Sequence, residues 1–345
     1  MTESKASKNA SQDQCAVVVI GRNEGQRLVA ALAQVKQLGC PVVYVDSDSV
    51  DGSVQQATAL NVPVIKLDQS QGLSAAKARN AGARWAMEHY PEVAYIQFID
   101  GDCQIDPGWL KRGVDAMLGP KVVAVCGRCR EMYPEASIYN RLCDMEWDTP
   151  IGELEATGGN VMIRRTSFES VGGFDPSLIA GEEPELCFRL RALGGKILRI
   201  DADMVRHDAD MHHFSQWWKR CLRGGYAEAA SQWKHRGRPG RLCQRAVVST
   251  LLWGLLLPLL TLLIAIFTAG VGVVLLVLYP CLAYRVYRRV RGRGVAKADA
   301  VLYAVSCVLS KFPGLLGVGL FHWRRMLGQR PMLIEHKPIP NEEVS

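Results

Sequence analysis

The chain begins without an apolar stretch. Residues 1–14 are polar, whereas a secretory signal carries an apolar core of ~7–15 residues. We therefore interpret 1–14 as a disordered N-terminus and expect the domain that follows to stay in the cytoplasm. Internal repeats and low-complexity linkers are missing as well, so nothing in the sequence indicates a repeat protein.

Paired metal-binding cysteines are also missing. Of the 11 cysteines, only Cys126 and Cys129 form a C-x-x-C, and no second pair completes a zinc site. The apolar run 122–125 before them favours strand residues, and the scattered cysteines are expected to be reduced thiols. The net charge is +7, but zinc-finger spacing and an aromatic RNA-binding signature are absent. Nucleic acid is therefore not a predicted partner.

Charged residues are absent from 246 to 284. One membrane crossing takes ~20 apolar residues, so this run predicts two helices that turn near 268–272, a transmembrane hairpin at 246–290. Because that turn has no Lys or Arg, the positive-inside rule places both flanks in the cytoplasm. The sequence predicts a multi-pass protein of the cell (inner) membrane, in contact with membrane lipid. The basic flanking residues are Lys234, Arg236, Arg238, Arg241, Arg245, Arg285, Arg288, Arg289, Arg291 and Arg293.

The C-terminal region, 291–345, is predicted to hold a basic loop, an apolar segment and a tail. The segment 300–321 is apolar except for Lys311, which is close to Pro313. A charge at mid-membrane costs about 3 kcal/mol on insertion scales, and a crossing would also export the basic residues of 324–330. We therefore expect an interfacial or re-entrant segment rather than a third crossing.

The rest of the chain, 15–245, is organised around the stretch 95–105. Its apolar residues predict a buried strand that ends in Asp100-Gly101-Asp102. Two carboxylates at the end of a strand suit Mg²⁺ or Mn²⁺, which prefer oxygen ligands and keep positions open for phosphates. The alternative is an Asp-Gly turn that only closes the strand.

A strand–helix–strand pattern precedes this stretch. The apolar runs 16–20 and 42–45 predict buried strands, and 26–38 predicts the helix between them. This arrangement implies parallel strands in an open α/β sheet. Asp46 and Asp48 follow the second strand, at the edge where such sheets bind ligands, and are candidate contacts to a base or ribose. An Asx-turn that caps the next helix is the alternative.

A third strand, 62–67, and a basic helix come next. Ser74 is placed to cap a helix that carries Lys77 and Arg79. These cations are candidate contacts to a diphosphate. The alternative is that they are solvated, as Lys and Arg on helices usually are.

Four motifs follow one another along the domain: I-G-R-N-E (20–24), V-D-S-D-S-V-D-G-S (45–53), A-R-N-A-G (78–82) and D-G-D (100–102). In their order and spacing they resemble the family-2 glycosyltransferases. The resemblance implies the GT-A nucleotide-diphospho-sugar transferase fold, a Rossmann-like mixed α/β sheet, followed here by the hairpin. It implies that Arg22 or Glu24, with Asp46 and Asp48, lies near the base and ribose of a nucleotide-sugar donor.

The resemblance also implies the metal site. In this family the D-x-D binds a metal and the donor diphosphate, which puts Asp102 on Mg²⁺ or Mn²⁺ and Asp100 on the metal and the sugar-nucleotide. Relatives often place a His near the metal, and His207 follows the predicted strand 197–200. A structural role for His207 is the equal alternative.

The second half of the domain extends the likeness. T-G-G-N-V-M-I-R-R (157–165), which includes Asn160, is similar to the acceptor-side segment of the family. In G-E-E-P-E, Glu182 and Glu183 take the place of the family's Glu-Asp pair, whose second carboxylate is the catalytic base. The extra methylene leaves open which of the two reaches the acceptor.

Local rules favour Glu183. Pro184 suits the first position of a helix and Gly194 its end. Because Glu183 precedes proline, it is expected to be extended, just outside the helix, with Glu182 pointing elsewhere. The alternative is that both merely favour a helix N-terminus.

The segment Q-W-W-K-R (216–220) is similar to the Q-x-x-R-W box of processive polysaccharide synthases but does not reproduce it, since Arg220 has no Trp after it. This weakens a processive interpretation. With Trp217, Trp218 and Arg223, the stretch 214–226 also suits a helix at the membrane interface.

The sequence thus predicts an inverting, metal-dependent glycosyltransferase of the hexosyltransferase type. Its donor is a nucleotide-sugar, and its acceptor is lipid-linked or a growing cell-surface polysaccharide (glycan), because the chain is anchored in the membrane. A nucleotidyltransferase and a non-catalytic membrane scaffold with a transferase-like domain are the alternatives. A nucleotidyltransferase would need a Gly-rich basic loop after the first strand, and residues 21–24 do not resemble one. A non-catalytic scaffold would have lost Asp100, Asp102 or the Glu pair, and all of these are present.

Overall fold

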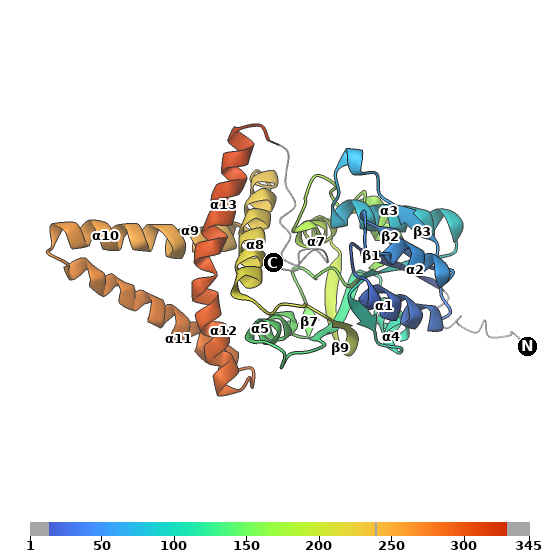
Figure 1. Cartoon of the computed structure of the whole chain (residues 1–345), viewed down its shortest axis with the longest axis horizontal. Coiled ribbons are helices and arrows are strands. Elements are labelled where there is room, and N and C mark those ends of the chain that lie inside the picture. The colour runs from blue at the N-terminus through green and yellow to red at the C-terminus, as the bar shows by residue number, and fades with distance from the viewer. Residues whose placement is uncertain (1–13, 239, 330–345) are drawn as a thin grey trace, which may run out of the picture.

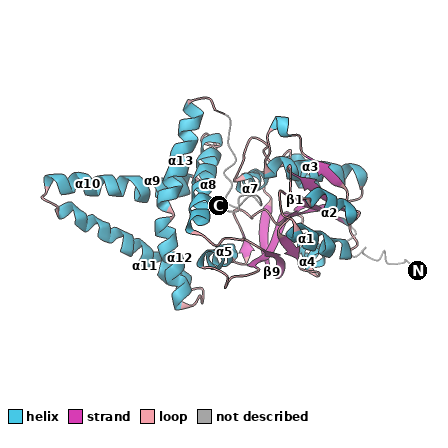
Figure 2. Cartoon of the chain, in the orientation of Figure 1, coloured by secondary structure: helices cyan, strands magenta, loops and turns pink. Residues whose placement is uncertain are grey.

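The computed structural model describes residues 14–238 and 240–329. The predictions for residues 1–13 and for the tail from 330 onward lie outside them. In the described residues, nine strands form one mixed sheet in the order β3-β2-β1-β4-β8-β6-β9-β5, with β7 paired to β9. Helices surround this sheet, and a helical C-terminal part lies to one side of it (Figure 2).

The strands are β1 Cys15–Gly21, β2 Val42–Asp46, β3 Val64–Lys66, β4 Tyr95–Asp100, β5 Cys103–Ile105, β6 Val122–Glu131, β7 Gly152–Glu153, β8 Val161–Arg164 and β9 Lys196–His207. The helices of this part are α1 Gln26–Gln37, α2 Ser53–Ala59, α3 Ala75–His89, α4 Trp109–Ala116, α5 Ile138–Trp147, α6 Arg165–Ser170, α7 Glu182–Ala192 and α8 Phe214–Lys234.

Two hydrophobic layers enclose the sheet. Successive side chains of a strand point to opposite faces, so Val17 and Val19 of β1 pack in one layer with Leu28 of α1. Val18 packs in the other layer with Ala83 of α3. Helices on both faces bury the strands completely, which is why β1 reads as an unbroken apolar run.

The predicted parallel unit is confirmed. β1 pairs in parallel with β2 and with β4. In that register, Gly21 lies opposite Asp46 and Ile20 opposite Asp100. The carboxyl ends of the three strands therefore meet at one edge of the sheet, where ligands bind in open α/β folds.

The strand predicted at 197–200 is too short. β9 continues to His207, because its second half pairs with β6 and with β5. The residues here alternate between exposed Asp201 and Asp203 and more buried Ala202 and Met204, the pattern of a strand with one wet face. His207 consequently ends the strand opposite Cys103 instead of lying in a loop.

The charge-free run forms a helical hairpin that projects away from the sheet domain (Figure 1). Its first arm comprises α9 Gln244–Leu251, a π-helical segment Leu252–Leu256 and α10 Leu257–Phe267. Its second arm comprises a 3₁₀ segment Val271–Val277 and α11 Leu278–Arg291. Large apolar side chains cover the outside, with Phe267 80% exposed. Such a surface suits lipid rather than water.

α12 Lys297–Leu309 and α13 Lys311–Met326 follow. They contact α11, α9 and α8 and run across the base of the hairpin in Figure 1. Together they form the third described helix that is long and apolar enough to cross a membrane, beside the two hairpin arms.

The two helices of this segment follow one another in nearly the same direction. Ser310, between them, keeps helical dihedrals of φ −60° and ψ −18°, so the chain does not turn back there. Pro313 lies in the first turn of α13, a position where proline is tolerated. The interfacial or re-entrant path in a membrane stays a prediction.

Candidate active site

A cavity of about 460 Å³ opens at the carboxyl edge of the sheet. One end is walled by the loop after β1 and the start of α3, including Arg22, Glu24 and Ser74. The other end is walled by α5 and α8, including Trp147 and Arg223. The carboxylates of the D-G-D and of α7 lie among its lining residues: Asp100, Asp102, Glu182 and Glu183.

Arg79 draws three of these acidic groups together. Its Nη2 donates to Asp100 Oδ1 at 2.8 Å, and its Nη1 lies 2.8 Å from Glu182 Oε1 and 3.2 Å from Glu183 Oε1. The Arg79 side chain is only 3% exposed. Gly159 leaves room for it, because a Cβ there would meet Arg79 Nη2 at 2.2 Å. The predicted capping of this helix by Ser74 is confirmed, but Arg79 is buried rather than solvated.

The start of α7 differs from the prediction. The helix begins at Glu182, with Gly181 before it in the left-handed region at φ 78°, so Pro184 is its third residue and not its first. Glu183 is therefore helical and not extended. Helical starts tolerate proline throughout the first turn, and the bias against a helical residue before proline is only a preference. Both carboxylates point to Arg79, so Glu182 does not point elsewhere.

Glu183 has the titration behaviour of a base that works near neutrality. Burial raises its pKa, the neighbouring Glu182 carboxylate raises it further, and Arg79 only partly opposes them. The resulting pKa is about 7. A carboxylate with this pKa holds a proton weakly enough to release it and strongly enough to take it.

Asp102 and His207 form a second cluster in the cavity. Asp102 Oδ2 lies 3.0 Å from His207 Nε2, and the Trp147 indole stacks on the imidazole with centroids 4.5 Å apart. Burial by itself lowers the pKa of His207, but Asp102 and Cys103 together outweigh it, and the pKa stands well above its usual value.

These residues suit a divalent metal. Ligand atoms of Asp102, Cys103 and His207 lie within 4.8 Å of one another, and carboxylate and imidazole are both ligands that Mn²⁺ accepts. Asp100, on the other side of Gly101, is engaged by Arg79. The structure therefore groups Asp102 with His207 more tightly than it groups Asp102 with Asp100.

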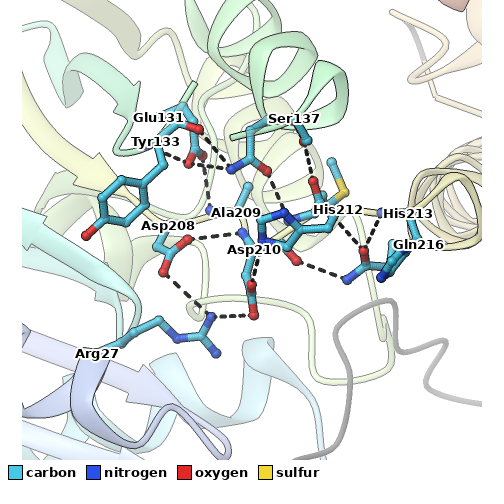
Figure 3. A network of polar contacts seen from close by, with 12 residues as sticks. Arg27, Glu131, Tyr133, Ser137, Asp208, Ala209, Asp210, His212, His213 and Gln216 are labelled. Atoms are coloured by element: carbon cyan, nitrogen blue, oxygen red, sulfur yellow. Dashed lines mark hydrogen bonds and ion pairs between the residues drawn. The ribbon is translucent and has the colours of Figure 1, made fainter. Parts of the chain in front are cut away.

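The loop after His207 forms part of the cavity wall and is fixed by a polar network (Figure 3). Arg27 reaches it from α1, with Nη1 at 3.1 Å from Asp210 Oδ2. Glu131 of β6 accepts from the Ala209 backbone N–H at 3.0 Å. Gln216 of α8 accepts from the His213 N–H at 2.9 Å. The loop is thus tied to the sheet, to α1 and to α8.

Four predicted contact residues do not line the cavity. Asp46 is buried and accepts hydrogen bonds from Tyr44 Oη and the Ser49 N–H, which is the role of the capping alternative. Asp48 has φ 69° in the same loop. Lys77 donates to the Gly72 carbonyl at 2.9 Å, and Asn160 accepts from the Asp100 backbone N–H at 3.1 Å. Their contacts to a substrate stay predictions.

The sequence did not indicate every lining residue. Arg27 and Trp147 are not expected at the site from the sequence. Arg223 is assigned there to a membrane-interface helix, and Arg220 to that helix and to the incomplete Q-x-x-R-W box. Arg27 carries one local signal, its i,i+3 ion pair with Glu24 at 3.0 Å. Trp147 carries none, because its partner His207 is distant in the chain.

Comparison with known proteins agrees with this geometry. Residues 16–172 match the family model described as glycosyl transferase family 2. The chain is 29% identical over 180 residues to the glycosyltransferase AglE of Haloferax volcanii, covering 48% of this chain and 57% of that one. It is 24% identical over 206 residues to the pre-mycofactocin glycosyltransferase of Mycobacterium tuberculosis, covering 56% and 42%. The chain thus spans about half the length of these curated relatives.

The architecture is shared with a solved structure. The mannosyltransferase PcManGT from Pyrobaculum calidifontis, in complex with GDP-Man and Mn²⁺, superposes with a TM-score of 0.60 at 16% identity, covering 90% of this chain and 88% of that one. Together with the sheet order and the D-G-D edge, this shows the GT-A fold, as predicted. The likeness to glycosyl transferase family 2 covers residues 16–172, which include the D-G-D edge.

Proposed function

We propose that this protein is an inverting, metal-dependent transferase that moves a sugar, a hexose in the simplest case, from a nucleotide-sugar to a lipid-linked or cell-surface glycan acceptor. The reaction takes place at the cytoplasmic face of the cell membrane. The observation that carries the proposal is the convergence of Glu182, Glu183 and Asp100 on one buried arginine, Arg79. A pure scaffold has no need to hold three carboxylates at a cavity wall, since buried charges are costly.

The donor belongs at the end of the cavity formed by the loop after β1. This edge of an open α/β sheet is where nucleotides bind, and Arg22, Glu24 and Arg27 line it. Asp102 and His207, which line the same cavity, would hold the metal. When bound, the metal supplies positive charge that stabilises the departing nucleoside diphosphate.

The chain's own residues then account for the proton. Glu183, ionised above its pKa of about 7, takes the proton from an acceptor hydroxyl. The hydroxyl oxygen attacks the anomeric carbon from the face opposite the diphosphate, whose bond to the sugar breaks. Configuration therefore inverts, and Glu183 returns its proton to solvent. Arg79 keeps Glu183 oriented by the 3.2 Å ion pair.

The membrane part supports a membrane-bound acceptor. The three apolar helices lie on the side of α8 that faces away from the cavity, so the active site lies close to the anchor. The basic residues that flank the hairpin favour the cytoplasmic face.

The decisive experiment is turnover of purified full-length protein with a panel of nucleotide sugars and Mn²⁺ or Mg²⁺. We expect one or a few donors to release nucleoside diphosphate and to transfer sugar to membrane lipid extract, with inverted anomeric configuration in the product. Retained configuration would disprove the inverting mechanism. Absence of turnover with every donor, while the protein stays folded, would disprove the proposed function.

A further inference from the structure

The cavity has a basic wall that neither the metal site nor the proposed base explains. Arg220 and Arg223 of α8 both line it, together with Cys143 and Trp147 of α5. They lie at the end of the cavity opposite the loop after β1, where the donor nucleotide is proposed to bind. From this position we propose that Arg223, assisted by Arg220, binds a phosphate group of the acceptor, so that the acceptor is a phosphate- or diphosphate-bearing lipid. This inference rests on the proposed function.

The spacing along α8 places both arginines on its inner face. Gln216, Arg220, Arg223 and Ala227 follow one another at intervals of four, three and four residues, which puts them on one side of a helix. Gln216 donates to the Asp210 carbonyl at 2.9 Å. At the other end, a Cβ at Gly181 would meet the Ala227 Cβ at 3.2 Å. The face between these contacts belongs to the cavity.

The outer face of α8 packs on the membrane part. A Cβ built at Gly225 would meet the Gly314 carbonyl oxygen of α13 at 2.1 Å, and one at Gly317 would meet the Leu222 carbonyl oxygen at 2.1 Å. One helix thus separates the site from the membrane helices. A lipid that reaches the site from the membrane passes α8, and its polar group meets the arginines before it meets Glu183.

The charges of this wall are unequal. Arg220 is already paired with Glu146, at 2.5 Å between Nη1 and Oε2. Arg223 is partly buried and has no carboxylate within salt-bridge distance among residues 14–238 and 240–329. A half-buried guanidinium at a cavity wall is best satisfied by an anion, and its planar fork matches phosphate oxygens. A neutral glycan would leave this charge uncompensated.

The test uses full-length protein in nanodiscs of zwitterionic phosphatidylcholine, first saturated with nucleoside diphosphate (UDP or GDP) and Mn²⁺ so that the donor subsite is filled. Calorimetric titration compares farnesyl diphosphate with farnesol.

We expect wild type to bind farnesyl diphosphate more tightly than farnesol. Arg223→Gln should weaken the affinity for farnesyl diphosphate about 10–100-fold, the effect of losing a charged hydrogen bond. Arg223→Lys should recover part of the loss. Lys219→Gln removes an exposed charge of the same helix and should change nothing.

Three results would overturn the inference. Equal affinity of wild type and Arg223→Gln for farnesyl diphosphate would show that Arg223 does not bind a phosphate group of the acceptor. Loss of UDP or GDP affinity in Arg223→Gln would assign the arginine to the donor instead, and equal binding of farnesol and farnesyl diphosphate would make the lipid chain the only determinant. Failure of the proposed function looks different, because wild type would then bind neither nucleotide with Mn²⁺ nor turn over any donor.

Discussion

Arg79 and Glu182 form an ion pair of 2.8 Å in which each side chain is only 3% exposed. Arg79 comes from α3 and Glu182 from the first turn of α7, so the pair joins two helices on the same face of the sheet. Because the same guanidinium also contacts Asp100 and Glu183, it links the D-G-D edge to the proposed base.

Removal of this guanidinium should unfold the protein readily. Arg79→Met leaves three carboxylates near one another without a counter-charge, and breaking a buried pair in this way costs about 3–5 kcal/mol. We expect a large drop in the thermal midpoint of unfolding in detergent. Arg84→Met is the matched control, since Arg84 is an exposed residue of the same helix and should stay within about 0.5 kcal/mol of wild type. A midpoint unchanged in Arg79→Met would show that the charges are not compensated by this residue.

The two glutamates should separate in their kinetics. Glu183→Gln removes the proposed base and should lower sugar transfer by roughly 10²–10⁴-fold, the usual contribution of general base catalysis. Its affinity for donor should persist, because the residues proposed to bind the donor lie elsewhere. Glu182→Gln should affect the chemical step less. If Glu182→Gln is the inactive variant and Glu183→Gln turns over normally, the base is Glu182.

Transfer should depend on pH through Glu183. Its pKa of about 7 lies above the usual value for Glu, so the carboxyl binds its proton below pH 7 and loses activity as a base. We expect kcat to fall about tenfold per pH unit below 7 and to level off above it. Stability has the opposite trend: the folded carboxyl has the higher pKa, so its contribution to stability weakens as pH rises from about 4.5 to 7. A pH-independent rate between 5 and 8 would contradict the assignment.

Metal dependence should follow Asp102. Asp102→Asn removes the negative charge of the Asp102–His207 pair and should abolish release of nucleoside diphosphate from the donor while the protein stays folded. Chelation of wild type should do the same, with recovery on added Mn²⁺ or Mg²⁺. Asp106→Asn, at a more exposed carboxylate that pairs with Arg112 outside the cavity, is the control. Full activity in excess chelator would disprove the metal role.

Two neighbouring glycines of α8 should respond oppositely to the same change. A Cβ at Gly225 collides with backbone of α13, whereas one at Gly224 meets nothing within 4 Å. Gly→Ala in an exposed helix interior gains about 1 kcal/mol, so Gly224→Ala should be stabilised. Gly225→Ala should lower the free energy of unfolding by about 1–3 kcal/mol, because the added methyl group overpacks the contact. Thermal unfolding in detergent measures both, and equal shifts would show that α8 and α13 are not in close contact.

Local patterns predicted the elements that depend on local sequence. The β1–α1–β2 unit, the cap at Ser74 and the hairpin appear where apolar periodicity and turn residues indicated them, because a buried strand or a lipid-facing helix needs a long apolar run. The end of β9 was missed because Asp201 and Asp203 look like a loop in the sequence. In the fold they form the wet side of a strand whose partners, β6 and β5, are far away in the chain.

At the candidate site, too, local sequence patterns could not predict contacts between residues that are distant in the chain. The carboxylates of the D-G-D and of α7 could be named from motifs, but the function of Arg79 as their common partner depends on contacts across 21 and 103 positions. The start of α7 was misplaced because a single local rule, the effect of Pro184, was outweighed by the left-handed Gly181 and the Arg79 ion pairs. Arg223 was assigned to a membrane surface because its neighbours in sequence are aromatic, whereas only the packing of α8 reveals which side of that helix it occupies.

The glycine contact between α8 and α13 has a mechanical consequence. Where one backbone touches another, no side chain is left to change rotamer, so the two helices cannot slide past each other in small steps. The wall of the cavity and the helix across the base of the hairpin therefore move as one rigid piece. If the protein works as proposed, the anchor sets the height of Glu182 and Glu183 above the bilayer, and the acceptor hydroxyl groups lie at a fixed distance from the membrane surface.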